Sequence, residues 1–283
     1  MNKRYVEIVV LSDAHLGTYG CHAKELLSYL RQLEIGTLIL NGDFIDIWQF
    51  KKRYFPTEHL QVIHEVLRFS LSGTRVYYLT GNHDDRLRAF SDFSAGDFHL
   101  RDKLEIRIRG KRYWIFHGDI FDASVMYSPW LAKFGAFSYD WIILFNRFIN
   151  KVRTRLGFSH LSIAGKIKSS VKKAVKYVSD FEQTALRKAI EQKYDYVICG
   201  HIHKPQIRTV ETSSGSVTYL NSGDWVENLT ALEYLDGTWS LFEYKSQNGR
   251  TIPTGTFHRT VNGSVNGQSI IFEAPHEAGL QAD

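Results

Sequence analysis

Short apolar runs alternate with polar, glycine-containing turns through the first half of the chain, and one further run of this kind follows much later. The runs are rich in Val, Ile, Leu and Tyr, which predicts buried strands. They span residues 6–11, 37–40, 76–79, 113–116 and 196–199. Apolar residues at helical spacing predict helices over residues 23–33 and 58–71. This alternation predicts an α/β fold with an at least partly parallel sheet, which binds ligands beyond the carboxyl ends of its strands.

Residues 122–180 break the alternation, and we interpret them as a helical insertion or cap on the α/β core. Ser128-Pro129 is a suitable helix start. Apolar side chains then recur at spacings of three and four, namely Trp130, Phe134, Phe137, Trp141, Leu144 and Phe148. A second helix is predicted over residues 163–178. The aromatic stripe has two interpretations: core packing, or an apolar trough or membrane-facing surface with a cationic rim.

The net charge of +5 is unevenly distributed. Residues 151–179 contain eight Lys or Arg and no Asp or Glu, so the rest of the chain carries −3. A local basic patch attracts phosphates, an anionic membrane surface or nucleic acid. A solvated helix face is the other interpretation of this patch. No known nucleic-acid module is recognisable, so we expect no nucleic-acid partner.

The last third of the chain predicts a different organisation, with short strands that complete the core as an antiparallel section. These strands are predicted at residues 206–212, 216–219, 230–235 and 239–244. We therefore expect one domain over residues 1–245, which includes the insertion at 122–180, and a mobile tail over 246–283. Cys21 and Cys199 are too few for a disulfide framework, and no run approaches the ~18 apolar residues of a membrane span. We expect a cytoplasmic chain.

Seven potential metal ligands follow the predicted strands: Asp13, His15, Asp43, Asn82, His117, His201 and His203. This set of carboxylates, imidazoles and one carboxamide suits Mn, Fe or Zn and disfavours a structural zinc cage. Asp13 and His15 are two residues apart, and in an extended chain such residues point to the same side. His201 and His203 repeat this spacing. Each pair is therefore expected to reach a common site.

Seven ligands are too many for one ion with an open position but suit two ions that share a carboxylate. Two divalent ions bring a charge of about +4, and Asp13 and Asp43 offset only part of it. The remaining positive charge favours an anionic substrate. Two such ions activate water and hold a phosphoryl group for in-line displacement. The residues therefore predict hydrolysis of a phosphate ester or a pyrophosphate, with Mn as the expected metal and Fe or Zn as alternatives.

The motifs that carry these ligands resemble those of the calcineurin-like metallophosphoesterases. The matching blocks are Asp13-x-His15, Gly42-Asp43-x-x-Asp46, Gly81-Asn82-His83-Asp84, His117-Gly118-Asp119 and Gly200-His201-x-His203. The resemblance covers roughly residues 6–245. It implies a four-layer α-β-β-α sandwich of two mixed sheets, here with a helical cap insertion, and a dinuclear metal site at one end.

The same resemblance implies a role for each ligand. One metal ion would be held by Asp13, His15, Asp43 and His203. The other would be held by Asp43, Asn82, His117 and His201, with Asp43 bridging the two ions. His83 would stabilise the phosphate or protonate the leaving oxygen, and Asp46 would orient His83. The nucleophile would be a hydroxide that bridges the ions, without a covalent phospho-enzyme.

Within this superfamily the sequence is similar to the UDP-2,3-diacylglucosamine hydrolases of lipid A synthesis. The similar stretches are Leu11 to Gly17, Gly42 to Trp48, Ser179 to Glu182 and Asn221 to Glu227. The resemblance implies cleavage of UDP-2,3-diacylglucosamine to UMP and 2,3-diacylglucosamine 1-phosphate at the cytoplasmic membrane face. Trp130 and Phe134 would line an apolar trough for the acyl chains, and Lys166, Lys172 and Lys173 would attract the pyrophosphate. The basic, amphipathic insertion would contact the anionic inner membrane as a peripheral attachment.

One departure from this pattern keeps two alternatives open. The best-known proteobacterial members have Arg at the position of His83. The chain is therefore also compatible with a phosphodiesterase or phosphomonoesterase that acts on a soluble phosphate or nucleotide. A non-catalytic scaffold on the same fold is the other alternative, but all seven ligands and His83 are intact.

Overall fold

The computed structural model describes residues 3–52, 54–121, 164–213, 215–247 and 250–253. The chain divides into two compact units. One contains Met1–Asp119 and Leu186–Asp283, and the other contains Ile120–Ala185. All strands described below and all seven predicted metal ligands belong to the first unit.

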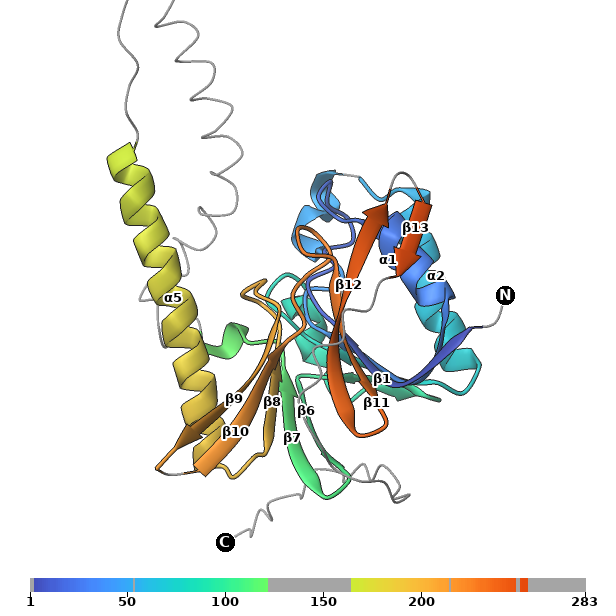
Figure 1. Cartoon of the computed structure of the whole chain (residues 1–283). Helices are drawn as coiled ribbons and strands as arrows, with labels where there is room; N and C mark the ends of the chain where they lie inside the picture. The colour runs from blue at the N-terminus through green and yellow to red at the C-terminus, as the bar shows by residue number, and fades with distance from the viewer. Residues whose placement is uncertain (1–2, 53, 122–163, 214, 248–249, 254–283) are drawn as a thin grey trace, which may run out of the picture. The chain divides into compact units, whose positions relative to one another are not determined.

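An eight-stranded mixed sheet forms the centre of the first unit (Figure 1). Its strand order is β13 (Arg250–Pro253), β12 (Thr238–Gln247), β11 (Thr230–Leu235), β1 (Arg4–Leu11), β2 (Leu33–Asn41), β3 (Arg75–Leu79), β5 (Phe98–Arg101) and β4 (Ser94–Ala95). The pairs β1–β2, β2–β3 and β3–β5 are parallel, and the remaining pairs are antiparallel. Leu11 lies opposite Leu40, and Asn41 lies opposite Leu79, so the parallel strands end side by side.

A second, five-stranded mixed sheet has the order β6 (Lys103–Ile108), β7 (Lys111–Phe116), β8 (Tyr196–Cys199), β10 (Gly215–Asn221) and β9 (Gln206–Thr212). Strand β8 is parallel to both β7 and β10. Apolar residues of both sheets form one buried cluster, in which Ile8 and Val10 of β1 meet Ile115 and Ile198. The two sheets therefore pack face to face, and the predicted α/β class with two mixed sheets is confirmed.

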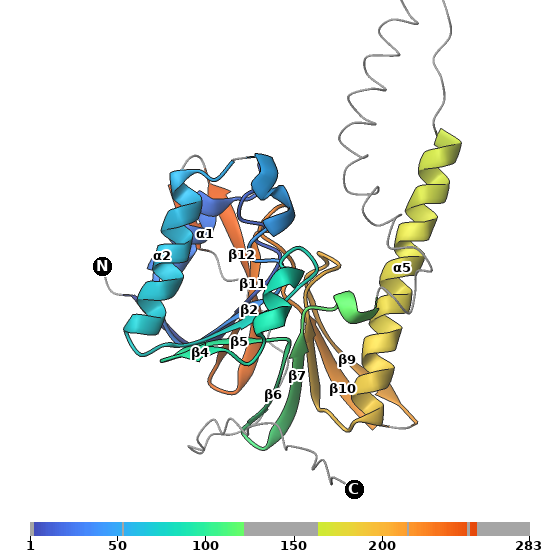
Figure 2. The ribbon, with the colours of Figure 1, turned by 180° about the vertical axis from the view of Figure 1, so that it is seen from behind.

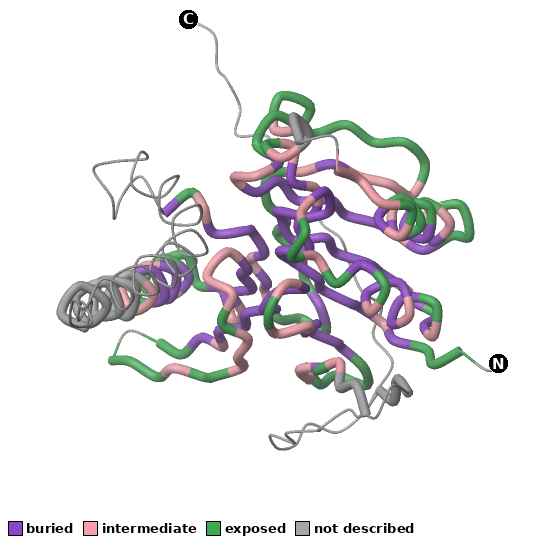
Figure 3. The backbone as a smooth tube through the Cα atoms, turned by 90° about the horizontal axis from the view of Figure 1, so that it is seen from above, coloured by how far each residue is buried: buried purple, intermediate pink, exposed green. Residues whose placement is uncertain are grey.

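Two helices, α1 (Ala23–Arg31) and α2 (Thr57–Leu71), lie side by side in both ribbon views (Figures 1 and 2). Their buried side chains, such as Leu26 and Val62, join the cluster that contains Val9 and Leu11 of β1. Alternate residues of β1 therefore face the helices and the second sheet, as the pleat of a strand requires. Figure 3 shows long stretches of buried backbone, and the last four residues of β1 are all buried.

Helix α5 (Ala164–Glu191) confirms the helix predicted over residues 163–178 from residue 164 onward. The helix is longer than predicted and continues to Glu191. Lys166, Lys172 and Lys173 lie in its first half. Trp130, Phe134 and the rest of the predicted aromatic stripe lie outside the described residues. Among the described helices, none combines the length and the apolar character that crossing a bilayer requires.

Strands β4, β5 and β6 fall outside the predicted elements. In β6, exposed Lys103, Glu105 and Arg107 alternate with buried apolar residues, so the strand contains no continuous apolar run. At the other end of the domain, β12 passes residue 245 and β13 extends to Pro253. The expected domain boundary therefore falls inside a strand. Three short 3₁₀ helices, η1 (Ile47–Lys52), η2 (Asp85–Phe90) and η3 (Asp119–Phe121), complete the described elements.

A buried carboxylate joins β1, α1 and β11. Glu233 accepts hydrogen bonds from both terminal nitrogens of Arg4 at 2.6 and 2.7 Å, and from the Tyr29 hydroxyl at 2.8 Å. Tyr29 and Glu233 are both buried. The three groups therefore form a polar network at the edge of the core, in which each buried hydrogen-bonding atom has a partner.

We predict that this network contributes measurably to stability. Tyr29→Phe should lower the free energy of unfolding by about 1 kcal/mol because one hydrogen bond is lost. Glu233→Ala should lower it by about 2 kcal/mol or more, because the Tyr29 hydroxyl then stays buried without its acceptor. Urea unfolding at fixed metal concentration measures both, with Glu34→Ala on an exposed position of β2 as the control. Equal midpoints for Glu233→Ala and Glu34→Ala would contradict the prediction.

Candidate metal centre

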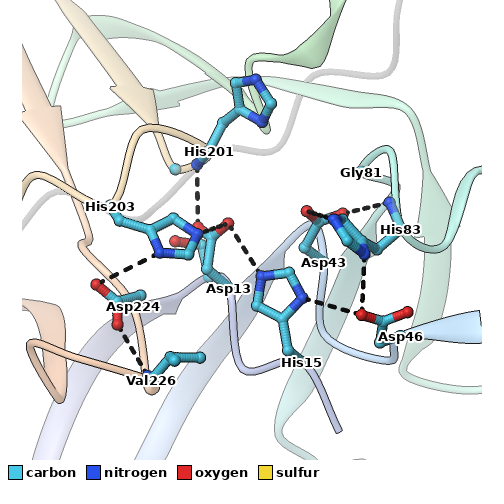
Figure 4. Close-up of polar contacts among 12 residues, drawn as sticks. Asp13, His15, Asp43, Asp46, Gly81, His83, His201, His203, Asp224 and Val226 are labelled. Carbon is cyan, nitrogen blue, oxygen red and sulfur yellow. Dashed lines mark hydrogen bonds and ion pairs between the residues drawn. The ribbon is translucent and has the colours of Figure 1, made fainter. Parts of the chain in front are cut away.

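Six of the seven predicted ligands gather where the central strands of both sheets end. Figure 4 shows five of them, namely Asp13, His15, Asp43, His201 and His203. Asp13 and Asp43 follow β1 and β2, and Asn82 follows β3. His117 directly follows β7, and His201 comes two residues after β8. Because parallel strands end at the same edge of a sheet, these loops are brought together without long connections.

The backbone of the ligand loops is not extended as expected, although Asp13 and His15 still share one group of potential ligands. Five ligands have a positive φ: Asp13 (53°), His15 (50°), Asp43 (51°), His201 (66°) and His203 (50°). Among the described non-glycine residues ten have a positive φ, so half of them are candidate ligands. Each such residue costs about 1–3 kcal/mol of strain. Hydrogen bonds between loops hold this backbone, since Asp13 N donates to Gly42 O and His15 N to Asp43 O.

Ligand atoms of these residues form three close groups: Asp13, His15 and His203; His15, Asp43 and His83; and Asp43, His117 and His201. His203 Nε2 lies 3.1 Å from Asp13 Oδ1, and His117 Nε2 lies 3.3 Å from Asp43 Oδ2. The imidazoles thus surround two buried carboxylates. Asp43 belongs to two of the groups, which places it between His15 on one side and His117 on the other.

Three candidate ligand atoms are buried without a hydrogen bond in the described part of the chain. They are Asp13 Oδ1, Asn82 Oδ1 and His117 Nε2. Leaving such atoms unsatisfied costs about 1–3 kcal/mol each. Bound divalent cations would satisfy these atoms, and the donor set of carboxylate, carboxamide and imidazole fits Mn, Fe or Zn.

The two carboxylates and the imidazoles stabilise one another's charged forms. Burial alone would raise the pKa of Asp13, but His203 and His117 outweigh it and the pKa is lowered. The pKa of Asp43 is lowered against its burial in the same way, mainly by His117. Burial lowers the pKa of His203, but Asp13 outweighs this effect and raises it to about 9. Both carboxylates are therefore ionised at neutral pH, as metal ligands must be.

Hydrogen bonds behind the ligands fix the orientation of the rings. His117 Nδ1 lies 2.9 Å from the Asn41 carbonyl oxygen, which can only accept, so Nδ1 carries the proton and Nε2 faces the carboxylates. The buried Asp46 lies between two imidazoles: its Oδ2 is 2.9 Å from His83 Nδ1 and 3.6 Å from His15 Nδ1. Although burial opposes it, these two contacts lower the pKa of Asp46 to about 2.

His83 is held beside Asp43 from two sides. Its backbone N–H donates to Asp43 Oδ1 at 2.7 Å, and its Nε2 lies 4.0 Å from Asp43 Oδ2. Burial lowers the pKa of the His83 imidazole, but the hydrogen bond to Asp46 and the nearby Asp43 together raise it. The Trp48 ring lies 4.4 Å from the His83 ring, and Trp48 is 37% exposed. His83 therefore has an ionised partner on Nδ1 and an exposed aromatic neighbour.

Two glycines allow the close approach of the ligand loops. A Cβ atom on Gly81 would lie 2.3 Å from Asp43 Oδ1, and one on Gly42 would lie 2.3 Å from His117 Cγ. Both distances are shorter than the contacts that real Cβ atoms make with neighbouring atoms. The Gly residues of the Gly42-Asp43 and Gly81-Asn82 blocks are thus required by the packing of one ligand against the next loop.

Sequence reasoning assigned no role to two residues that organise the site. The buried Asp84 accepts hydrogen bonds from Phe44 N (3.1 Å), the Tyr78 hydroxyl (2.6 Å) and Gly81 N (2.6 Å), and thereby fixes the Gly81-Asn82 turn. Burial, and then the charge of Asp43, raises the pKa of Asp84 to about 6. Asp84 is the last residue of the Gly81-Asn82-His83-Asp84 block, so this motif is the sequence signal that could have identified it.

Arg88 is the second such residue. It lies in η2 and donates to Asp119 at 2.9 Å and to Asp102 at 3.1 Å. Asp119 is two residues after His117, so Arg88 ties the turn after β3 to the turn after β7. No motif in the sequence marks this arginine, because its partners are distant along the chain.

The described structure does not test the remaining predicted site residues. Trp130 and Phe134 lie outside the described residues. Lys166, Lys172 and Lys173 lie on α5, where the backbone but not the side chains is described.

Residues 6–205 match the family of calcineurin-like phosphoesterases, and the chain belongs to this family. Among curated proteins, the UDP-2,3-diacylglucosamine hydrolase of Aliivibrio fischeri is 25% identical over 239 residues, which cover 83% of this chain and 97% of that protein. The enzyme of the same name from Stenotrophomonas maltophilia is 24% identical over 242 residues and covers 82% of this chain and 96% of its own length.

Solved structures with a similar fold are more distant in sequence. An archaeal phosphodiesterase is 14% identical, with a TM-score of 0.42, and covers 83% of this chain and 98% of its own. A dimetal phosphatase from Danio rerio is 14% identical, with a TM-score of 0.38, and covers 83% and 94%.

We predict that Asp43 is required for metal binding. Asp43→Ala removes the carboxylate shared by two ligand groups, so the affinity for Mn²⁺ should fall by roughly 100-fold or more. Calorimetric titration of chelator-treated protein with Mn²⁺ measures this affinity. Asp85→Ala, which removes an exposed carboxylate two residues after His83, is the matched control and should bind Mn²⁺ as the unmodified chain does. Unchanged binding by Asp43→Ala would exclude the proposed centre.

Proposed function

We propose that this protein is a dinuclear metal-dependent phosphoesterase that hydrolyses UDP-2,3-diacylglucosamine to UMP and 2,3-diacylglucosamine 1-phosphate. The observation that carries the proposal is the sharing of Asp43 between two groups of potential ligands. The substrate is suggested by curated UDP-2,3-diacylglucosamine hydrolases, of which several align over more than 90% of their length. Membership of the phosphoesterase family supports the reaction type.

In this proposal one metal ion binds Asp13, His15, Asp43 and His203, and the other binds Asp43, Asn82, His117 and His201. Two divalent ions supply the activated water and neutralise charge at phosphorus. Mn²⁺ is the proposed metal, and Fe or Zn would fit the same ligands. Asp13 and Asp43 neutralise about half of the charge of two divalent ions, so the centre retains a positive charge for the pyrophosphate.

His83 is the proposed proton donor to the leaving oxygen. Its Nδ1 is held by ionised Asp46 at 2.9 Å, so its protonated form is stabilised and its Nε2 side is the one near Asp43. Asp46 thereby positions His83 and keeps it charged until the proton is transferred. Trp48, half-exposed against the His83 ring, is positioned to contact the part of the substrate next to the phosphate.

The insertion supplies the proposed lipid contacts. Trp130 and Phe134 would line the trough for the acyl chains, and Lys166, Lys172 and Lys173 would attract the pyrophosphate. The eight cations of residues 151–179 would also hold the protein at the anionic cytoplasmic face of the membrane. This contact would present the acylated substrate to the site without a membrane span.

His83 favours one alternative. The residue at this position is the general phosphoesterase histidine and not the Arg of the best-known lipid A enzymes. A phosphodiesterase or phosphomonoesterase with a soluble phosphate or nucleotide substrate would use the same metal centre.

We predict Mn²⁺-dependent release of UMP from UDP-2,3-diacylglucosamine in mixed micelles. A chelator should abolish turnover, and added Mn²⁺ should restore it. UDP-glucose offers the same pyrophosphate bond without acyl chains, and bis-p-nitrophenyl phosphate offers a soluble phosphodiester bond. The kcat/KM of both should be lower by roughly 100-fold, or about 2.7 kcal/mol. Chromatographic measurement of UMP and p-nitrophenol gives these values. Equal or better turnover of the soluble compounds would favour the alternative.

We predict that His83→Ala lowers kcat by roughly 10²–10⁴-fold, because general acid catalysis is lost. Mn²⁺ binding should change little, since His83 is not a proposed ligand. Asp46→Asn should lower kcat less and move the basic limb of the pH profile to lower pH, because the charge that raises the pKa of His83 is removed. His64→Ala on the exposed side of α2 is the control. A full rate for His83→Ala would remove this residue from the mechanism.

A further inference from the structure

The loop between β10 and β11 (residues 222–229, here the clamp loop) contains none of the proposed metal ligands, yet it contacts two of the loops that do. Trp225 N donates to the Asp13 carbonyl oxygen at 3.1 Å, and the Ser12 hydroxyl donates to the Gly223 carbonyl oxygen at 2.8 Å. On the other side, Ser222 N donates to the Cys199 carbonyl oxygen at 3.1 Å. The clamp loop thus bridges the ends of β1 and β8.

Asp224 is the charged residue at the centre of the clamp loop. Its side chain is fully buried, and Oδ1 accepts backbone hydrogen bonds from Val226 (2.8 Å), Glu227 (2.5 Å) and Asn228 (3.2 Å). Oδ2 faces away from this backbone turn. It accepts a hydrogen bond from the Asn228 side chain and lies 3.8 Å from His203 Nδ1 (Figure 4). One oxygen therefore shapes the loop, and the other faces a proposed ligand.

The His203 ring lies between two carboxylates. Nδ1 faces Asp224, and Nε2 lies 3.1 Å from Asp13 Oδ1. The backbone of His203 is also held, because the Asn228 side chain donates to its carbonyl oxygen at 2.9 Å. His203 has a φ of 50°, in the left-handed region, which costs free energy and persists only where the surroundings hold it. Asn228 therefore contacts both the strained backbone of His203 and the carboxylate behind its ring.

We propose that Asp224 and Asn228 are positioning residues that orient His203 toward one metal ion of the centre. A cation on Nε2 requires the proton on Nδ1, and a carboxylate opposite Nδ1 favours this tautomer and makes the imidazole a better donor. Asn228 holds both the carboxylate and the His203 carbonyl. The inference rests on the proposed metal centre, and it extends that centre to a loop without ligands.

A purely structural role for Asp224 predicts a different outcome. A residue that merely shapes the clamp loop would affect the stability of the metal-free protein and both metal ions alike. The loop contacts Asp13, a proposed ligand of one ion, and the end of β8 just before His201, a proposed ligand of the other ion. A positioning role acts through His203, which is a proposed ligand of one ion. The two roles therefore differ in whether one ion or both are weakened.

Asp224→Asn tests the proposal, with Mn²⁺ as the probe. We expect the full chain to bind two Mn²⁺ ions, and Asp224→Asn to bind one of them unchanged and the other roughly 10–100-fold more weakly. At two equivalents of Mn²⁺, the electron paramagnetic resonance spectrum should change from a coupled pair to a mononuclear ion. Glu227→Gln removes the same charge at an exposed position of the clamp loop and should behave as the unmodified chain.

Asn228→Ala provides a second variant in case Asp224→Asn does not fold in chelator. It retains the carboxylate but loses the contact to the His203 carbonyl, and should weaken the same ion by a smaller factor. Equal weakening of both ions in the folded variants, or no change in either, would overturn the positioning role. Failure of the unmodified chain to bind two ions would instead refute the proposed centre, so the two failures are distinguishable.

Discussion

The site depends on the burial of two carboxylates, Asp13 and Asp43, at the adjoining ends of β1 and β2. Both are almost completely shielded from water. Isolated buried charges are expensive, and the free energy must be recovered from neighbouring cations or hydrogen bonds. Here imidazoles from four separate loops surround the two groups. The fold therefore brings distant segments together around a negative charge that needs compensation, which is also the requirement for binding divalent cations.

The ligand loops are strained and tightly packed because the ligands must converge within a few ångströms. Left-handed backbone at five ligands redirects side chains over a very short length of chain. The absence of a Cβ at Gly42 and Gly81 lets neighbouring loops approach this closely. Strain of this kind persists only where the surroundings hold it. Hydrogen bonds between ligand loops, together with Asp84, Arg88 and the clamp loop, provide that support.

The sequence predicted the parts of this arrangement that have local signals. Buried strand β8 is a continuous apolar run and β11 is mostly apolar, and the bounds of both agree with the prediction. The polar blocks after such runs identified the residues that the structure brings together. Edge strand β6 was missed because its exposed charged residues interrupt the apolar pattern. The left-handed conformation of Asp13 and His15 was also missed, since neither residue type requires it.

The contacts behind the ligands could not be predicted because they depend on tertiary structure. Arg88 and Asp119 are 31 residues apart, and Asp224 and His203 belong to different loops. No motif contains Arg88, and the motifs that contain Asp119 and Asp224 do not show which groups these carboxylates contact. They become interpretable only when the ring nitrogen or turn that each one contacts is known.

The geometry of the centre also depends on packing between the sheets. Asp13, Asp43 and Asn82 follow strands of the eight-stranded sheet, whereas His117 and His201 follow β7 and β8 of the other sheet. The distance between these two sets is fixed by apolar residues just before them, including Val10, Ile39 and Ile198, which share one buried cluster. Protein interiors are close-packed and transmit small displacements. These core residues therefore set the spacing of the candidate ligands as well as the stability of the fold.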